Sequence, residues 1–323
     1  MFSLKTSIPR ILCCCFLPAL LCTGSWAADA PFVAPEVQTH LIQSQFVDQT
    51  FEISVQVPVS RTDGSERFPV LYLTDSYDGV SFSRSTAMMQ LGGDIPRFIT
   101  VGIGYEMEHS LSSLDIRNRD LTQVPMQGPV PPSLSGIIQG VPELNLTKTS
   151  GGAPEFLQFI REELQPFIDE NYPTVPEDRG YWGDSLGGLF GLYVLFNQPD
   201  TFNRYIIGSP SIWWEDRAIM KDARAFVDSH SDLPVRLFLG VGALEEQAEV
   251  PALAEAAMVT NMFELESMLQ SANLEGLELS SYLFPNETHT SVISMNYIRG
   301  VQSVYTRPAF SFLLQALMFS TSD

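Results

Sequence analysis

The sequence predicts a single α/β domain with a mostly parallel sheet covered by helices on both faces. Short apolar or alternating segments typical of strands recur along the chain, and longer segments with helical apolar spacing separate them in its second half. Strands that alternate with helices favour parallel pairing, because each crossover helix packs on a face of the sheet. Residues 28–323 are enough for one large core and show no internal repeat.

Three strands are expected in the first half of the chain. Residues 51–57 alternate apolar and polar side chains, which favours a half-exposed strand. Residues 70–73 and 98–103 are apolar runs, which favour buried strands. Residues 110–150 are rich in Pro, Gly, Ser and Thr and keep no apolar period, so a long loop is predicted there.

Helices and strands alternate after residue 151. Apolar residues within 156–168 recur at spacings of three and four, as on an amphipathic helix. Further helices are expected at 189–196, 214–229, 252–272 and 292–305. A short strand is expected at 179–182, and buried strands are expected at 205–207, 236–241 and 279–284. This order predicts the parallel part of the sheet.

The first 27 residues resemble a signal peptide. Lys5 and Arg10 precede the apolar stretch 11–22, and Ser25-Trp26-Ala27 has the small-x-small pattern of a cleavage site. The stretch is shorter than the roughly 20 apolar residues that a spanning helix needs, so we favour cleavage over a membrane anchor. We therefore exclude residues 1–27 from the fold and expect no membrane association after cleavage.

Cysteine usage and charge limit the compartment and the partners. All four cysteines (Cys13, Cys14, Cys15 and Cys22) lie in the leader, so the mature chain has neither a disulfide nor a thiol nucleophile. We expect a bacterial periplasmic or extracellular protein, and bulky Leu21 disfavours lipidation of Cys22. The net charge of −20 becomes −22 when two cationic residues leave with the leader, which disfavours nucleic acid and anionic membrane surfaces as partners.

The motif Gly183-Asp184-Ser185-Leu186-Gly187 lies between an expected strand and an expected helix. This is a G-x-S-x-G nucleophile elbow, in which a strained turn exposes the serine hydroxyl at its tip. The flanking glycines let the strand and the helix approach closely. Ser185 is therefore the candidate nucleophile, and the backbone amide of Leu186 can donate to an oxyanion. Without this context, the motif would be an ordinary glycine-rich turn.

A serine nucleophile needs a base, and histidine titrates near neutrality. Of the four histidines, His289 lies in a loop between the last expected strand and the last full helix, where this fold places its base. For His40, His109 and His230, surface or capping roles are favoured.

The third member of a triad should be a carboxylate on a loop between the serine and the histidine. Glu245 and Glu246 follow the expected strand 236–241, and we favour Glu245 as the residue that orients the imidazole. Asp184 is excluded because it adjoins the serine. The second oxyanion donor should be a backbone amide in the loop that begins at Thr74.

Several segments together resemble the putative esterase family of α/β-hydrolases, which includes esterase D, siderophore esterases, family 1 carbohydrate esterases and mycolyl transferases. The similar segments are 69–73, 117–120, 150–156, 163–166, 183–188, 209–214 and 287–292. The resemblance implies the α/β-hydrolase fold and a Ser185, His289 and Glu245 triad. It assigns the second oxyanion amide to Tyr77, although Thr74-Asp75-Ser76 departs from the family's Leu-Asp-Gly at two positions.

The predicted function is a secreted serine esterase that forms an acyl-enzyme and needs no metal or other cofactor. Trp213 and Trp214 follow a strand end, where they either line a substrate pocket or pack in the core. The substrate is expected to be a small-molecule or carbohydrate ester. Few basic residues are present for the anionic catecholates of siderophore trilactones. An acyltransferase, or a non-catalytic binding protein that keeps the fold, is the alternative.

Overall fold

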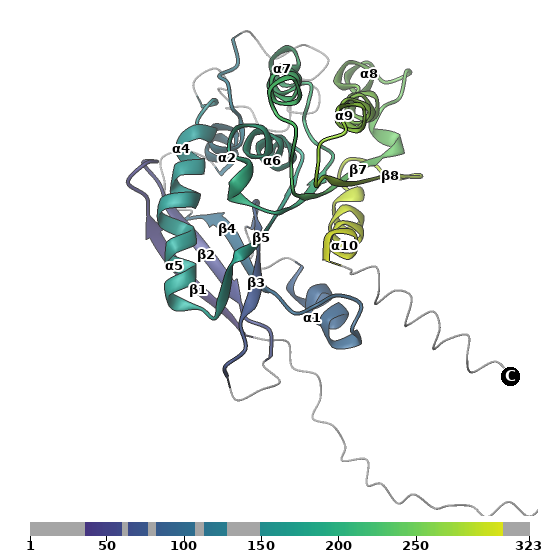
Figure 1. Cartoon of the computed structure of the whole chain (residues 1–323). Helices are drawn as coiled ribbons and strands as arrows, with labels where there is room; N and C mark the ends of the chain where they lie inside the picture. The colour runs from purple at the N-terminus through teal and green to yellow at the C-terminus, as the bar shows by residue number, and fades with distance from the viewer. Residues whose placement is uncertain (1–35, 60–63, 77–81, 107–112, 128–148, 306–323) are drawn as a thin grey trace, which may run out of the picture. The chain divides into compact units, whose positions relative to one another are not determined.

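The computed structural model describes residues 36–59, 64–76, 82–106, 113–127 and 149–305 (Figure 1). The predicted signal peptide, Tyr77, His109 and most of the predicted long loop lie outside these residues. The described strands are β1 (Val37–Gln43), β2 (Thr50–Gln56), β3 (Phe68–Leu73), β4 (Ile99–Tyr105), β5 (Thr174–Asp184), β6 (Arg204–Gly208), β7 (Arg236–Gly242) and β8 (Glu278–Phe284).

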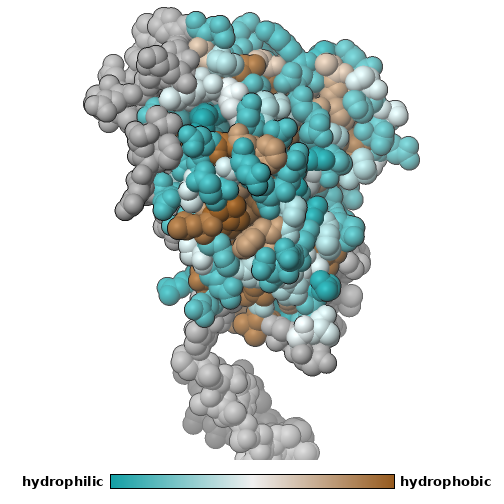
Figure 2. Space-filling model, turned by 90° about the vertical axis from the view of Figure 1, so that its left-hand side faces the viewer, coloured by the Kyte–Doolittle hydropathy of each residue, from teal (hydrophilic) through white to brown (hydrophobic). Residues whose placement is uncertain are grey.

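The eight strands form one sheet in the order β1-β2-β4-β3-β5-β6-β7-β8. At one edge, β2 pairs antiparallel with both of its neighbours, β1 and β4. All other pairings, from β4 to β8, are parallel. The predicted mostly parallel sheet is therefore confirmed. The edge strand β1 was not predicted. It lies at the left in Figure 1. Figure 2 shows the molecule from that side, where the surface is largely hydrophilic around an apolar area.

Helices cover both faces of the sheet, as predicted. The described α-helices are α1 (Ser83–Gly92), α2 (Ser113–Leu121), α4 (Ala153–Gln158), α5 (Gln165–Asn171), α6 (Leu186–Asn197), α7 (Trp214–Ser229), α8 (Pro251–Ala256), α9 (Met258–Ala272) and α10 (Val292–Tyr305). The predicted helix 156–168 includes a π-helical segment, Phe159–Leu164, between α4 and α5. The predicted helix 252–272 divides at Ala257, which has a left-handed backbone. None of the described helices is both long and apolar enough to cross a membrane.

Two apolar cores lie on opposite faces of the sheet. The larger core joins the sheet to α4, α6, α7 and α9, while the smaller core includes Val292, Tyr297 and Val301 of α10. Figure 1 shows α1 and α10 on the side of the sheet away from α6. Burial of apolar side chains on both faces is the main source of stability for such a domain.

Two expectations from the first half of the chain were wrong. β2 is not half exposed: Phe51, Ile53 and Val55 lie in the larger core, and Ser54 on the opposite face is buried as well. Residues 113–121 are not loop but α2, in which apolar Ile116 and polar Asp120 are both buried. Burial of polar side chains hides the apolar period on which the prediction relied.

Candidate active site

Ser185 lies at the sharp turn between β5 and α6. Its backbone has φ 62° and ψ −119°, which is a strained conformation for a residue with a side chain. The amide of Ser185 donates to the carbonyl of Gly208 at the end of β6, over 3.0 Å. The elbow geometry predicted from the motif is therefore present in the structure.

The two flanking glycines are required by close contacts. A Cβ atom on Gly183 would lie 2.4 Å from the carbonyl oxygen of Gly187, and one on Gly187 would lie 2.6 Å from the hydroxyl of Thr74. Such distances are much shorter than van der Waals contact. Any larger residue at either position would push the strand, the helix or the neighbouring loop away.

His289 lies in the loop between β8 and α10 and contacts Glu245. Its Nδ1 atom is 2.5 Å from the Oε2 atom of Glu245. The Oε1 atom of the same carboxylate accepts hydrogen bonds from the amide of Gly242, over 2.6 Å, and from the hydroxyl of Ser209, over 2.7 Å. Only 1% of the Glu245 side chain is exposed, against 39% for His289. The carboxylate is thus fixed, and the imidazole reaches the surface of the site.

A short 3₁₀ turn, Ala243–Glu245, explains why the first glutamate and not the second faces the imidazole. The Glu245 side chain turns back to the amide at the start of this turn, as in a capping box. Glu246 points elsewhere and accepts hydrogen bonds from the amide and the hydroxyl of Thr260, each over 2.7 Å.

The other described histidines lie away from Ser185. The Nε2 atom of His40 contacts the hydroxyl of Tyr172, which belongs to the region of β1 and α5. The ring of His230 stacks on Phe226 at the end of α7. These positions are structural, as their sequence context indicated.

The environment of His289 raises its pKa. Burial acts in the opposite direction, because it disfavours the charged imidazolium. The hydrogen bond and the negative charge of Glu245, with a contribution from Asp184, outweigh burial, and the pKa of His289 lies above its ordinary value. The site therefore stabilises a proton on the imidazole.

The hydroxyl of Ser185 lies 3.4 Å from the hydroxyl of Ser211, a buried residue that follows β6. Among the described residues, no hydrogen bond joins Ser185 to His289. Both side chains nevertheless line the same pocket. Catalytic hydrogen bonds are often long or misaligned without a substrate and tighten only when it binds.

The pocket at Ser185 has a volume of about 390 Å³. Its lining includes Thr74, Asp75, Phe82, Trp182 and Arg117. Arg117, which sequence reasoning did not select as a site residue, donates two hydrogen bonds to the carboxylate of Asp75, over 2.6 and 2.9 Å.

The two predicted oxyanion donors differ in what the structure shows. Leu186 is the first residue of α6, where a backbone amide has no acceptor within its own helix. Tyr77 lies outside the described residues.

The two tryptophans do not line the pocket at Ser185. The side chain of Trp214 is 1% exposed, lies in the larger core and donates a hydrogen bond from Nε1 to the carbonyl of Val124. Trp213 is half-buried and packs against the same core. For Trp214, the structure favours the core role that the sequence left open.

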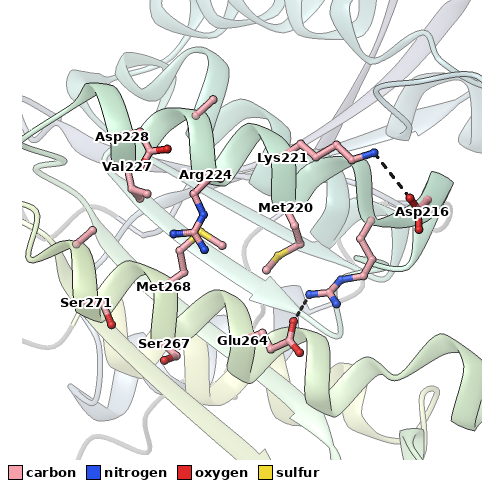
Figure 3. A pocket seen from close by; sticks show the side chains of 13 residues that line it. Asp216, Met220, Lys221, Arg224, Val227, Asp228, Glu264, Ser267, Met268 and Ser271 are labelled. Atoms are coloured by element: carbon pink, nitrogen blue, oxygen red, sulfur yellow. Dashed lines mark hydrogen bonds and ion pairs between the residues drawn. The ribbon is translucent and has the colours of Figure 1, made fainter.

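A larger groove of about 1080 Å³ lies elsewhere, between α7 and α9 (Figure 3). Ion pairs of Lys221 with Asp216 and of Arg217 with Glu264 lie along it. Neither Ser185 nor His289 contributes to its lining. Among the described residues, no cluster of His, Cys, Asp and Glu could hold a metal ion.

Known proteins resemble this chain in sequence and fold. Ferri-bacillibactin esterase BesA of Bacillus subtilis is 31% identical over 84% of this chain and 90% of its own length. The siderophore triacetylfusarinine C esterase of Aspergillus fumigatus is 30% identical over 78% of this chain and 88% of its own length. The structure of siderophore hydrolase EstA from Aspergillus nidulans matches with a TM-score of 0.69 and 27% identity, over 83% of this chain and 93% of that one.

The fold is the α/β-hydrolase fold, as the resemblance implied. Residues 138–278 match the family described as "Putative esterase". Together with the two siderophore esterases that match over most of their length, this match shows that the chain belongs to the putative esterase family.

Proposed function

We propose that the protein is a serine esterase that hydrolyses carboxylic esters through an acyl-enzyme on Ser185. The observation that carries the proposal is the contact of the buried Glu245 carboxylate with Nδ1 of His289. This contact leaves Nε2 of the imidazole for the serine hydroxyl, which lines the same pocket. Nucleophile, base and orienting acid are the three parts of a triad.

In the first half-reaction, Oγ of Ser185 attacks the ester carbonyl carbon while Nε2 of His289 takes the hydroxyl proton. Glu245 stabilises the resulting imidazolium. The amide of Leu186 donates to the oxyanion of the tetrahedral intermediate, and a second amide is assigned to Tyr77 by the family resemblance. The carbon–oxygen bond to the alcohol then breaks, and the imidazolium gives its proton to the leaving oxygen.

In the second half-reaction, a water molecule attacks the acyl-enzyme carbonyl and gives a proton to His289. The bond to Ser185 breaks, the serine oxygen takes the proton back, and the carboxylic acid leaves. A transferase would use a sugar or another alcohol in place of water. Product analysis distinguishes the two reactions.

The relatives' names support siderophore esters as the first substrate class to test. Arg117 lines the pocket, but Asp75 neutralises much of its charge. The described lining therefore offers little net attraction to strongly anionic catecholates, which favours the less charged substrates of the class. Export to the periplasm or the medium, with cleavage after Ala27, is part of the same proposal.

The test is hydrolysis by the purified chain of a panel of esters. The panel contains p-nitrophenyl esters of graded acyl length, acetylated and feruloylated sugars, bacillibactin and triacetylfusarinine C. We expect Ser185→Ala to lower kcat by several orders of magnitude with an unchanged circular dichroism spectrum. More than about a tenth of the activity in that variant would mean that another nucleophile acts.

A further inference from the structure

A chain of buried hydrogen bonds continues from Glu245 away from His289. The hydroxyl of Ser209 donates to Oε1 of Glu245 over 2.7 Å. The side-chain amide of Asn296, on α10, donates to the Ser209 hydroxyl over 3.3 Å and to Oδ1 of Asp184 over 3.1 Å. Ser209 and Asn296 are fully buried.

The chemistry of the groups fixes which one donates in each of these hydrogen bonds. A carboxylate only accepts hydrogen bonds, so the single proton of the Ser209 hydroxyl points to Glu245. The oxygen of Ser209 must then accept, and among the described residues the donor that reaches it is the NH₂ group of Asn296. The second proton of that group reaches Asp184. Within the described part of the chain, the Oδ1 atom of Asn296 has no hydrogen-bond partner, which is the cost of this orientation.

Two glycines of the sheet leave space for the hydrogen-bonded side chains of Asp184 and Asn296. A Cβ atom on Gly208 would lie 2.2 Å from Oδ1 of Asp184, and one on Gly240 would lie 2.2 Å from Oδ1 of Asn296. Ser209 itself has a left-handed backbone with φ 38°, and its amide donates to the carbonyl of Gly240. A strained backbone in a fully buried residue indicates that the position of its side chain matters.

We propose that Ser209, oriented by Asn296, is a positioning residue that holds the Glu245 carboxylate against His289. The inference rests on the proposed function, in which His289 is the base. Glu245 receives its other fixed hydrogen bond from the amide of Gly242, so both donors act on the same oxygen, Oε1, and direct Oε2 to the imidazole. Loss of the Ser209 hydroxyl leaves the carboxylate free to rotate about the Gly242 contact.

Ser209→Ala should therefore lower kcat with little change in KM. A misplacement of about 1 Å can reduce the rate by about a hundredfold, and we expect a loss of this order. Ser209→Gly removes the same hydroxyl and relieves the left-handed backbone, so it serves as a second variant if the alanine protein folds poorly. Both variants should lose activity to a similar extent.

A double-mutant cycle with Glu245→Ala separates positioning from stability. If Ser209 acts through Glu245, Ser209→Ala should change kcat by less than about threefold once Glu245 is absent.

Thr174→Val is the matched control, because the buried hydroxyl of Thr174 also donates to a carboxylate. Its acceptor is Asp169, over 2.7 Å, at the opposite end of β5 from Ser185. That variant should keep its activity within about threefold, although it loses a comparable bond.

The cycle is measured with two readouts: ester hydrolysis and the rate at which diisopropyl fluorophosphate labels Ser185. Labelling, in which Oγ displaces fluoride, depends on the nucleophile and its base and needs no ester substrate. A wild-type chain that is labelled but hydrolyses no ester would overturn the proposed function alone. Equal loss of labelling from Ser209→Ala with and without Glu245, or loss of less than about threefold, would overturn the positioning role. Absence of labelling in the wild type would overturn both.

Discussion

The Nδ1 atom of His289 lies 2.5 Å from the Oε2 atom of Glu245, although the two residues are 44 positions apart in the chain. The carboxylate is buried and the imidazole is partly exposed. An acid in this position fixes the tautomer of the base and stabilises its protonated form. The pair is therefore the part of the site whose chemical role can be measured most directly.

Glu245→Gln should keep most of the local hydrogen bonds while it removes the negative charge beside the imidazole. We expect kcat to fall by up to about four orders of magnitude, as for the acid of other serine triads. Steady-state kinetics with an ester that the wild type hydrolyses measures this effect. Glu246→Gln is the control and should be nearly silent, because Glu246 is bonded to Thr260. If Glu246→Gln loses activity and Glu245→Gln does not, the orienting acid is Glu246 and the assignment to Glu245 is wrong.

The activity should fall at acidic pH as His289 becomes protonated, because only the neutral imidazole can act as base. Glu245 raises the pKa of His289 against the effect of burial, so removal of its charge should lower that pKa. The acidic limb of kcat/KM for Glu245→Gln should therefore move to lower pH, while the maximum rate falls. A shift to higher pH would show that Glu245 does not stabilise the imidazolium.

The parts of the site that the sequence predicts are those fixed by local turn chemistry. The glycines around Ser185 are required by contacts within the turn itself and its nearest neighbours. Glu245 faces the imidazole because its side chain returns to an amide three residues earlier. His289 follows the last strand of a parallel sheet, whose strand ends all meet at one edge.

The parts that the sequence does not predict depend on contacts between distant elements. Ser209 and Asn296 carry no local pattern that predicts their contact, and they meet because β6 ends beside β5 and α10 packs against both strands. Likewise, β1 and α1 are held by tertiary packing more than by an apolar period of their own. Arg117 belongs to α2, for which a loop was expected.

Trp214→Phe should destabilise the protein without changing substrate binding. The substitution leaves a small cavity in the core and removes the donor to the carbonyl of Val124, which together should cost about 2–4 kcal/mol. Urea unfolding measures the loss, and KM for a hydrolysed ester should stay the same. Trp213→Phe, at a half-buried position, should cost less. A raised KM in Trp214→Phe at full stability would instead place the indole in substrate binding.

Asp184→Asn should stabilise the protein near neutral pH. Burial raises the pKa of Asp184 from 3.8 to about 6, although His289, Asn296 and Arg117 act against it. The folded state therefore binds the proton of Asp184 more tightly than the unfolded state does, and the wild type loses stability as the pH rises from about 4 to about 6. At about 1.36 kcal/mol for each pH unit, the loss is up to about 3 kcal/mol above that range.

Asparagine carries no charge at any of these pH values, and its side-chain oxygen can still accept the hydrogen bond from Asn296. The difference in the free energy of unfolding between Asp184→Asn and the wild type should therefore be small near pH 4 and reach its maximum, in favour of the variant, near pH 8. Urea unfolding at the two pH values measures it. If the variant is instead the less stable protein near pH 8, the carboxylate is ionised at little cost, and its contacts with Asn296 and the charge of Arg117 outweigh the effect of burial.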